Sequence, residues 1–115
     1  MTIQRIERGS RMSQAVVHNE TVYLAGQVAV DPSSNVAQQT RQILANIDSL
    51  LESVGSDKSR ILTATIWLAD IGKVAEMNSV WDKWIDPENP PARACVQAAM
   101  VKPDYKVEIM VTAAL

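Results

Sequence analysis

The sequence predicts an α+β fold in which a mixed β-sheet carries two helices on one face, with the elements in the order βββαβαββ. Two segments repeat apolar residues at helical spacing. Several shorter segments are rich in β-branched residues and are bounded by turn-forming residues. The length of 115 residues suits one compact domain, so we expect a single domain over residues 1–115.

Three strands are expected near the N-terminus. Residues 3–7 predict a short strand. Residues 14–17 and 21–25 predict a hairpin around residues 18–20, because β-branched residues flank a polar turn. Gly26 then ends the second strand of this hairpin.

The most regular helical pattern follows residues 31–35. Apolar side chains recur along one face of this helix at Ile43, Leu44, Ile47, Leu50, Leu51 and Val54. The candidate N-caps are Ser33, Ser34 and Asn35. Gly55 directly follows the apolar stripe, which is typical of a helix that ends in a left-handed residue.

Residues 61–68 predict a strand with both faces partly covered. Its expected faces are Leu62, Ala64, Ile66 and Leu68 on one side, and Thr63, Thr65 and Trp67 on the other. Asp70 is a candidate N-cap for a second helix, which prolines end near Asp86. The expected buried stripe of that helix is Val74, Met77, Trp81 and Trp84.

Two strands complete the chain, over residues 92–98 and 106–113, with a breaker segment at 101–104 between them. Two helices on one face leave the other face of the sheet without a cover. Because a small domain buries a limited fraction of its surface, we expect copies of the chain to pack on that bare face.

Composition excludes several classes of function. Eleven Lys and Arg residues against 13 acidic ones give a net charge of -2, so no basic surplus is present for nucleic acid. A lone cysteine, Cys95, forms no intrachain disulfide and suits the cytoplasm. We expect no membrane span, because no apolar run reaches the ~20 residues that a span needs. We expect no signal peptide, because residues 1–5 lack an apolar signal core. Scattered glycines give no phosphate loop, so we expect no nucleotide cofactor.

Two charged residues on the last two strands are candidates for binding and catalysis. Arg93 offers a rigid fork of donors that fits a carboxylate, although the alternative is a surface arginine paired with an acid. Glu108 lies on the less apolar side of its strand, and its alternative is a solvated or ion-paired carboxylate. Only their combination suggests a site for a small carboxylate.

Other single residues favour structural roles. His18 lies in a predicted turn without a second histidine, which favours a solvated residue over a general base or metal ligand, and we expect no metal site. Cys95 has no partner to activate it, which favours a small, partly buried thiol. Gly26 either ends a strand or lets a ligand approach the backbone closely.

Three stretches of the chain resemble the signatures of the RidA (YjgF/YER057c/UK114) family of imine deaminases. They are Pro91-Ala92-Arg93-Ala94-Cys95-Val96, Val107-Glu108-Ile109 and Ala25-Gly26-Gln27-Val28. The length, the helix positions and the place of Asn78 also fit this family. The resemblance implies chorismate-mutase-like subunits in a homotrimer, with a cleft for a small carboxylate between each pair of subunits.

By the same resemblance, Arg93 holds the substrate carboxylate and Glu108 positions and activates water. Gly26, Asn78, Cys95 and Met12 would line the cleft. The implied activity is a cofactor-independent hydrolase that converts reactive 2-imino acids, including those derived from 2-aminoacrylate, to 2-keto acids and ammonia.

The chain departs from the family pattern at three places. Met12 stands where the family has a tyrosine, Ala25 replaces a common serine, and residues 101–103 replace a Leu-Pro pair. Met12 removes a phenolic hydroxyl and makes the cleft mouth less polar, which suggests a non-archetypal subgroup with another substrate range or slower turnover.

Two functions from other classes remain open, beside a structural or chaperone-like role in which exposed Met and Trp residues would cover client surfaces. The first is a non-catalytic, trimeric binding or regulatory protein for small carboxylate metabolites. The second is the ribonuclease or translation-inhibitor activity that some family names carry, which the net charge of -2 and the lack of a basic stripe disfavour.

Overall fold

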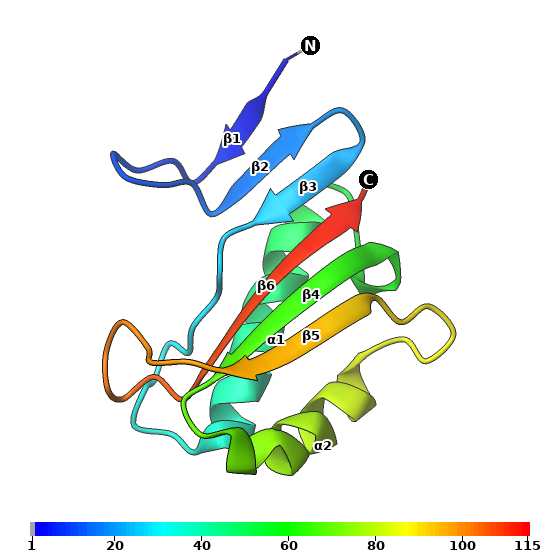
Figure 1. Ribbon diagram of the computed structural model, residues 1–115. Coiled ribbons are helices and arrows are strands. Elements are labelled where there is room, and N and C mark those ends of the chain that lie inside the picture. Colours follow the sequence, from blue (N-terminus) through cyan, green and yellow to red (C-terminus); the bar gives the residue numbers. More distant parts are fainter. Residues whose placement is uncertain (1) are drawn as a thin grey trace.

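The computed structural model describes residues 2–115 and contains one six-stranded sheet and two longer helices within them (Figure 1). The strands are β1 (Gln4–Ile6), β2 (Ala15–His18), β3 (Thr21–Leu24), β4 (Ile61–Leu68), β5 (Ala92–Gln97) and β6 (Val107–Ala114). The helices are α1 (Val36–Ser53) and α2 (Val74–Trp84), and the short 3₁₀ turns are η1 (Lys58–Arg60) and η2 (Ile71–Lys73). This order confirms the predicted succession of elements.

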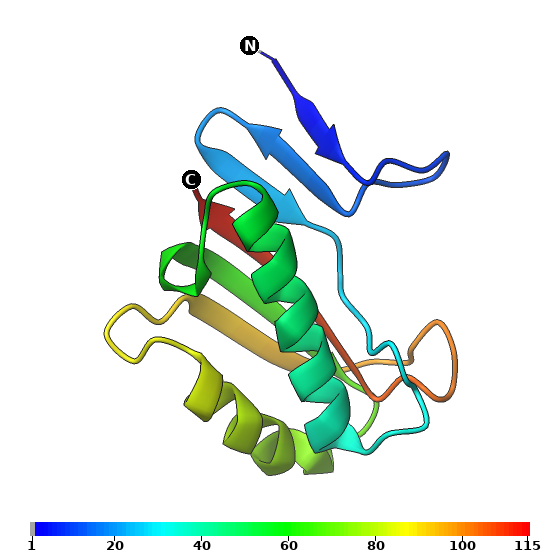
Figure 2. The same ribbon diagram turned by 180° about the vertical axis from the view of Figure 1, so that it is seen from behind.

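The sheet is mixed, with the strand order β1-β2-β3-β6-β4-β5. β4 pairs in parallel with the edge strand β5 because α2 carries the chain back across the sheet between them. All other neighbours pair antiparallel. Both helices lie on the same face, as Figure 2 shows from behind, and the opposite face is left open.

α1 begins and ends where the sequence predicts. The Asn35 side chain accepts a hydrogen bond from the Gln38 backbone N–H at 2.9 Å, which makes Asn35 the N-cap among the three candidates. Gly55 has a φ of 82°, the left-handed conformation expected after the helix. The predicted apolar stripe faces the sheet, with Ile43 and Ile47 fully buried.

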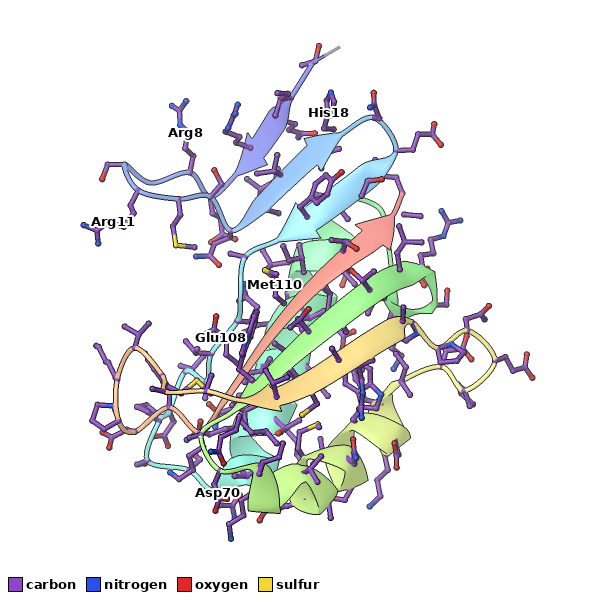
Figure 3. All side chains as sticks on the ribbon, in the orientation of Figure 1. Arg8, Arg11, His18, Asp70, Glu108 and Met110 are labelled. Carbon is purple, nitrogen blue, oxygen red and sulfur yellow. The ribbon has the colours of Figure 1, made fainter. Side chains whose placement is uncertain are left out.

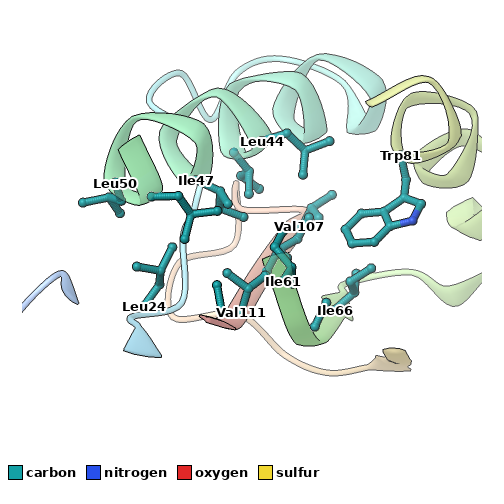
Figure 4. Close-up of a cluster of buried hydrophobic side chains, with 14 of the residues drawn as sticks. Leu24, Leu44, Ile47, Leu50, Ile61, Ile66, Trp81, Val107 and Val111 are labelled. Carbon is teal, nitrogen blue, oxygen red and sulfur yellow. The ribbon is translucent and has the colours of Figure 1, made fainter. Parts of the chain in front are cut away.

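The core lies between the helices and the sheet (Figure 4). β6 contributes Val107, Ile109 and Val111, each at most 1% exposed. Because side chains alternate along a strand, the residues between them point to the open face. The sheet therefore has a dry face under α1 and α2 and a separate face that no element of residues 2–115 covers.

Three local predictions need correction. Leu62 was expected to share a buried face with Ala64, but an irregularity in the pairing of β4 with β6 leaves Leu62 48% exposed and buries Ile61 instead. Asp70 caps η2, through the Gly72 N–H, rather than α2 itself. In α2 the third fully packed position beside Met77 and Trp81 is Val80, while Val74 and Trp84 are partly exposed.

Among residues 2–115, no helix combines the length and the apolar composition that a membrane crossing requires.

Candidate active site

Glu108 lies on the open face of the sheet. Its neighbours in β6, Val107 and Ile109, are fully buried under the helices, so Glu108 points the other way, as Figure 3 shows. It pairs across the ladder with Trp67 of β4. The carboxylate is half-buried at the end of the sheet where the 98–101 loop begins.

The Glu108 carboxylate lies directly against the backbone of Gly26. A Cβ atom at Gly26 would overlap the Glu108 Oε2 atom, so only glycine allows the carboxylate to lie against this backbone. The chain is fixed here because Gln27 and Ile109 exchange two backbone hydrogen bonds, at 2.8 and 3.1 Å. The close approach predicted as one alternative for Gly26 is therefore present, and the approaching group is a carboxylate of the same chain.

Glu108 also borders a hollow of about 220 Å³ on the open face. The other lining residues are Trp67, Ala98, Ala99, Met100 and Val101. Glu108 is the only charged group in this lining, so its carboxylate faces a small space whose other lining residues are uncharged. A carboxylate in such a place is suited to accept a proton from a bound water or small polar ligand.

Arg93 lies on the helix side of the edge strand β5. Its Nη1 donates a hydrogen bond of 2.8 Å to Asn78 Oδ1 on α2. Its guanidinium carbon is 5.2 Å from the centre of the Trp81 ring, a cation–π contact. These two contacts hold one side of an exposed guanidinium, which leaves the rest of its donor fork available to a carboxylate.

Cys95 lies two residues beyond Arg93, on the same face of β5, and packs against the core. Burial raises the pKa of the Cys95 thiol above its usual value, and the nearby Arg93 charge lowers it by less. The sulfur is therefore a protonated thiol at neutral pH. This state suits a lining residue and not an activated nucleophile.

One chain thus carries two separate groups of the predicted site residues. Arg93, Asn78 and Cys95 lie on the helix side of β5, whereas Glu108 and Gly26 lie on the open face. The structure brings the members of each group together, but it does not bring Arg93 to Glu108 within one subunit. A site that uses both residues needs a second copy of the chain.

Met12 lies in the loop between β1 and β2 and is 49% exposed. It borders a shallow hollow with the three arginines Arg5, Arg8 and Arg11. This loop is tied to the Gly26 segment, because the Gln14 carbonyl accepts a hydrogen bond from Ala25 N at 2.9 Å. The loop that carries Met12 is therefore joined to the segment that leads to Gly26, whereas the hollow beside Met12 is lined by neither Glu108 nor Arg93.

Comparisons with known proteins match this fold over nearly the whole chain. Residues 2–115 match the family model described as Endoribonuclease L-PSP. A crystal structure from Neisseria meningitidis, described as a member of the YjgF protein family, superposes with a TM-score of 0.96 at 43% identity and covers 99% of this chain and 95% of that one. The chain belongs to the RidA (YjgF/YER057c/UK114) family.

Two relatives of known sequence differ in how similar they are to the chain and in whether their names state an activity. The RutC family protein YoaB of Escherichia coli (strain K12) is 46% identical to the chain over 115 residues, which is 100% of both proteins. The Bos taurus protein named 2-iminobutanoate/2-iminopropanoate deaminase is 36% identical over 103 residues, 84% of this chain and 74% of that protein. The relative with a named activity is thus the more distant of the two.

Sequence reasoning missed two tryptophans of this RidA-family protein. Trp81 was assigned to the core alone, but its ring also supports the Arg93 guanidinium. Its spacing of three from Asn78 places both residues on one side of α2, which was the available signal. Trp67 lines the hollow beside Glu108, and only the pairing register of β4 with β6 reveals this.

Proposed function

We propose that this chain is an imine deaminase that hydrolyses reactive 2-imino acids to 2-keto acids and ammonia. The proposal rests on two groups of residues on one chain, which we call half-sites because each supplies one part of the proposed site. The first half-site is the Arg93 guanidinium, which Asn78 and Trp81 hold while some of its N–H donors stay free. The second half-site is the Glu108 carboxylate, which lies against Gly26 beside a small hollow.

The two half-sites are complementary, and we propose that they meet between the subunits of a homotrimer. The open face offers an apolar surface, on which Tyr23 and Val96 are each 47% exposed and Met110 is 40% exposed. A second copy that covers this face would bury these side chains and bring its edge strand toward Glu108. This assembly is the one that the family resemblance implies.

In the proposed reaction Arg93 binds the substrate carboxylate through two parallel hydrogen bonds. This fixes the imine carbon beside a water molecule that Glu108 orients. Glu108 takes a proton from the water as its oxygen bonds to the imine carbon, and it returns the proton to the nitrogen. Glu108 then carries the remaining hydroxyl proton to the amine of the carbinolamine, and the C–N bond breaks as the C=O bond forms, which gives the keto acid and ammonia. This sequence of steps needs no cofactor.

The named activity of the Bos taurus relative supports this reaction class, because that protein shares 36% identity with the chain. The departure at Met12 bears on the substrate range. By the family resemblance, the exposed thioether of Met12 replaces a phenol at the mouth of the cleft, so we expect the preferred imine to have a larger or more apolar side chain than the smallest ones.

The test is the rate of ammonia and keto-acid release when an amino-acid oxidase generates imines in place from several amino acids. We expect acceleration by the wild-type protein and a loss of about 100-fold in kcat/KM for Arg93→Ala, since a charge-assisted pair is removed. Arg60→Ala is the matched control, because Arg60 is an exposed arginine of η1 that belongs to neither half-site.

No acceleration with any imine would overturn the proposed enzyme. If a keto acid still binds to the wild-type protein and not to Arg93→Ala, the function becomes the non-catalytic carboxylate-binding trimer. Calorimetry with 2-ketobutyrate distinguishes these outcomes.

The description of the family model names an endoribonuclease, and that activity is not proposed for this chain. The net charge of -2 gives little to hold a phosphate backbone. RNA binding that weakens steeply with salt would contradict this choice.

A further inference from the structure

A groove of about 350 Å³ runs between α1 and α2 on the helix face of the molecule. Leu44 and Val80 form a buried apolar floor, and Ala45 and the side chain of Trp84 border it. Figure 2 shows the two helices side by side on this face. The groove is on the opposite side of the sheet from the open face, and none of Arg93, Asn78 and Trp81 lines it.

The rim of the groove is positively charged although the chain as a whole is acidic. Three cationic side chains, Arg41, Lys58 and Lys83, line it together with one carboxylate, Asp48. Asp48 is already engaged, because its Oδ2 accepts a hydrogen bond of 2.9 Å from Trp84 Nε1. The groove therefore offers an excess of positive charge above an apolar floor.

Trp84 is held in place from two sides. The Lys58 Nζ lies 5.5 Å from the centre of its ring, and the Trp81 ring lies 5.5 Å from it at an angle of 54°. Such contacts fix the aromatic wall before any ligand arrives. A fixed wall lowers the ordering cost of binding a flat ligand against it.

We propose that this groove is a second binding site, which takes a small aromatic carboxylate. The volume lies within the range of about 300 to 1,000 Å³ that small-molecule sites occupy. The aromatic body would rest on the Leu44 and Val80 floor beside Trp84, and the carboxylate would pair with Arg41 and Lys58 at the rim. Charge complementarity selects an anion, and the apolar floor selects a flat hydrocarbon body.

The test is titration of the ¹⁵N-labelled protein with 2-naphthoate, followed by NMR. We expect saturable shifts of the Trp84 indole N–H signal and of backbone amides in residues 41–48 and 80–84. The uncharged 2-naphthamide has nearly the same shape and should bind about tenfold more weakly, because it lacks the charge that the rim recognises.

Amino-acid substitutions test whether the ligand binds in the groove between α1 and α2. The double variant Arg41→Gln/Lys58→Gln should remove the preference for the acid over the amide, whereas Lys73→Gln, a lysine of η2 outside the groove, should keep it. Lys83→Gln keeps the contact between Lys58 and Trp84 and should weaken binding partially. Arg93→Ala should keep the preference of the groove for the acid over the amide, because Arg93 does not line the groove.

The proposal is overturned by any of four results, of which three come from the titration itself. These are no saturable shift, equal binding of acid and amide, or shifts confined to residues near Glu108. Binding of an acidic peptide in the groove without binding of 2-naphthoate would also overturn it. None of these readouts requires imine hydrolysis, so they are independent of the proposed activity.

Discussion

The hydrogen atom in place of a side chain at Gly26 leaves the space that the Glu108 carboxylate occupies. The two residues are far apart in the sequence and meet because the Gln27 backbone bonds to Ile109. Gly26, for which the sequence also allowed a simple strand end, is thus part of the candidate site. Its role is steric, and it can be tested without changing the charge of the site.

We expect Gly26→Ala to lower kcat/KM for imine hydrolysis by about 100-fold, because the added methyl group displaces the proton-transferring carboxylate. The measurement is the coupled imine assay, with thermal unfolding to confirm the fold. Gly9→Ala is the matched control, since a Cβ atom there meets its nearest neighbour at an ordinary 3.5 Å. Equal losses in both variants would contradict a specific role for Gly26.

Cys95 is expected to react slowly with alkylating reagents at neutral pH. Burial raises the pKa of its thiol, so the thiolate fraction at pH 7 is below that of a free cysteine and grows only as the pH rises past the usual value. The measurement is the rate of iodoacetamide labelling between pH 7 and pH 10, with glutathione as reference.

Cys95→Ser should keep kcat within about twofold, because a lining thiol takes no part in the chemistry. Rapid labelling at pH 7 together with an inactive serine variant would instead indicate a nucleophilic cysteine.

α1 supplies most of the helix-side core, and its ends are fixed by local chemistry. Asn35 satisfies the Gln38 N–H at the start, and the left-handed Gly55 follows the end. These local signals agree with the apolar stripe of the helix. That agreement explains why this element could be predicted so closely from the sequence.

Asn35→Ala should therefore lower the free energy of unfolding by about 1 kcal/mol, since the cap is lost and no core contact changes. Urea unfolding followed by circular dichroism measures this. Asn35→Ser should keep most of the stability because its hydroxyl also accepts from the helix N–H groups. If both variants lose the same stability, the cap is not the cause.

Across the whole molecule, the two half-sites lie on opposite sides of one sheet. This arrangement predicts complementation between inactive chains. If Arg93 of one copy works with Glu108 of another, a mixed trimer of Arg93→Ala and Glu108→Gln chains contains some sites with both native residues.

We expect co-refolded equal amounts of the two variants to recover about a quarter of the wild-type activity, the share of sites that random mixing completes. Each variant alone should stay inactive, and mixing without refolding is the control. No recovery in mixtures shown to be trimeric would contradict a site shared between subunits.

The sequence by itself determined the succession of elements, the bounds of β4 and the caps of α1, because these follow from periodicity and from contacts between near neighbours. It also determined that Glu108 lies opposite the buried residues of its own strand. Alternation is a property of one strand, so it could be read locally.

Only the tertiary structure decided which face of β5 meets the helices. The apolar side of this strand, with Ala94 and Val96, would be expected to face the core, yet Arg93 and Cys95 lie on the helix side. Because β5 is a parallel edge strand beside α2, Asn78 and Trp81 provide polar and aromatic partners for the arginine there. Such partners come from another element, and alternation within one strand carries no information about them.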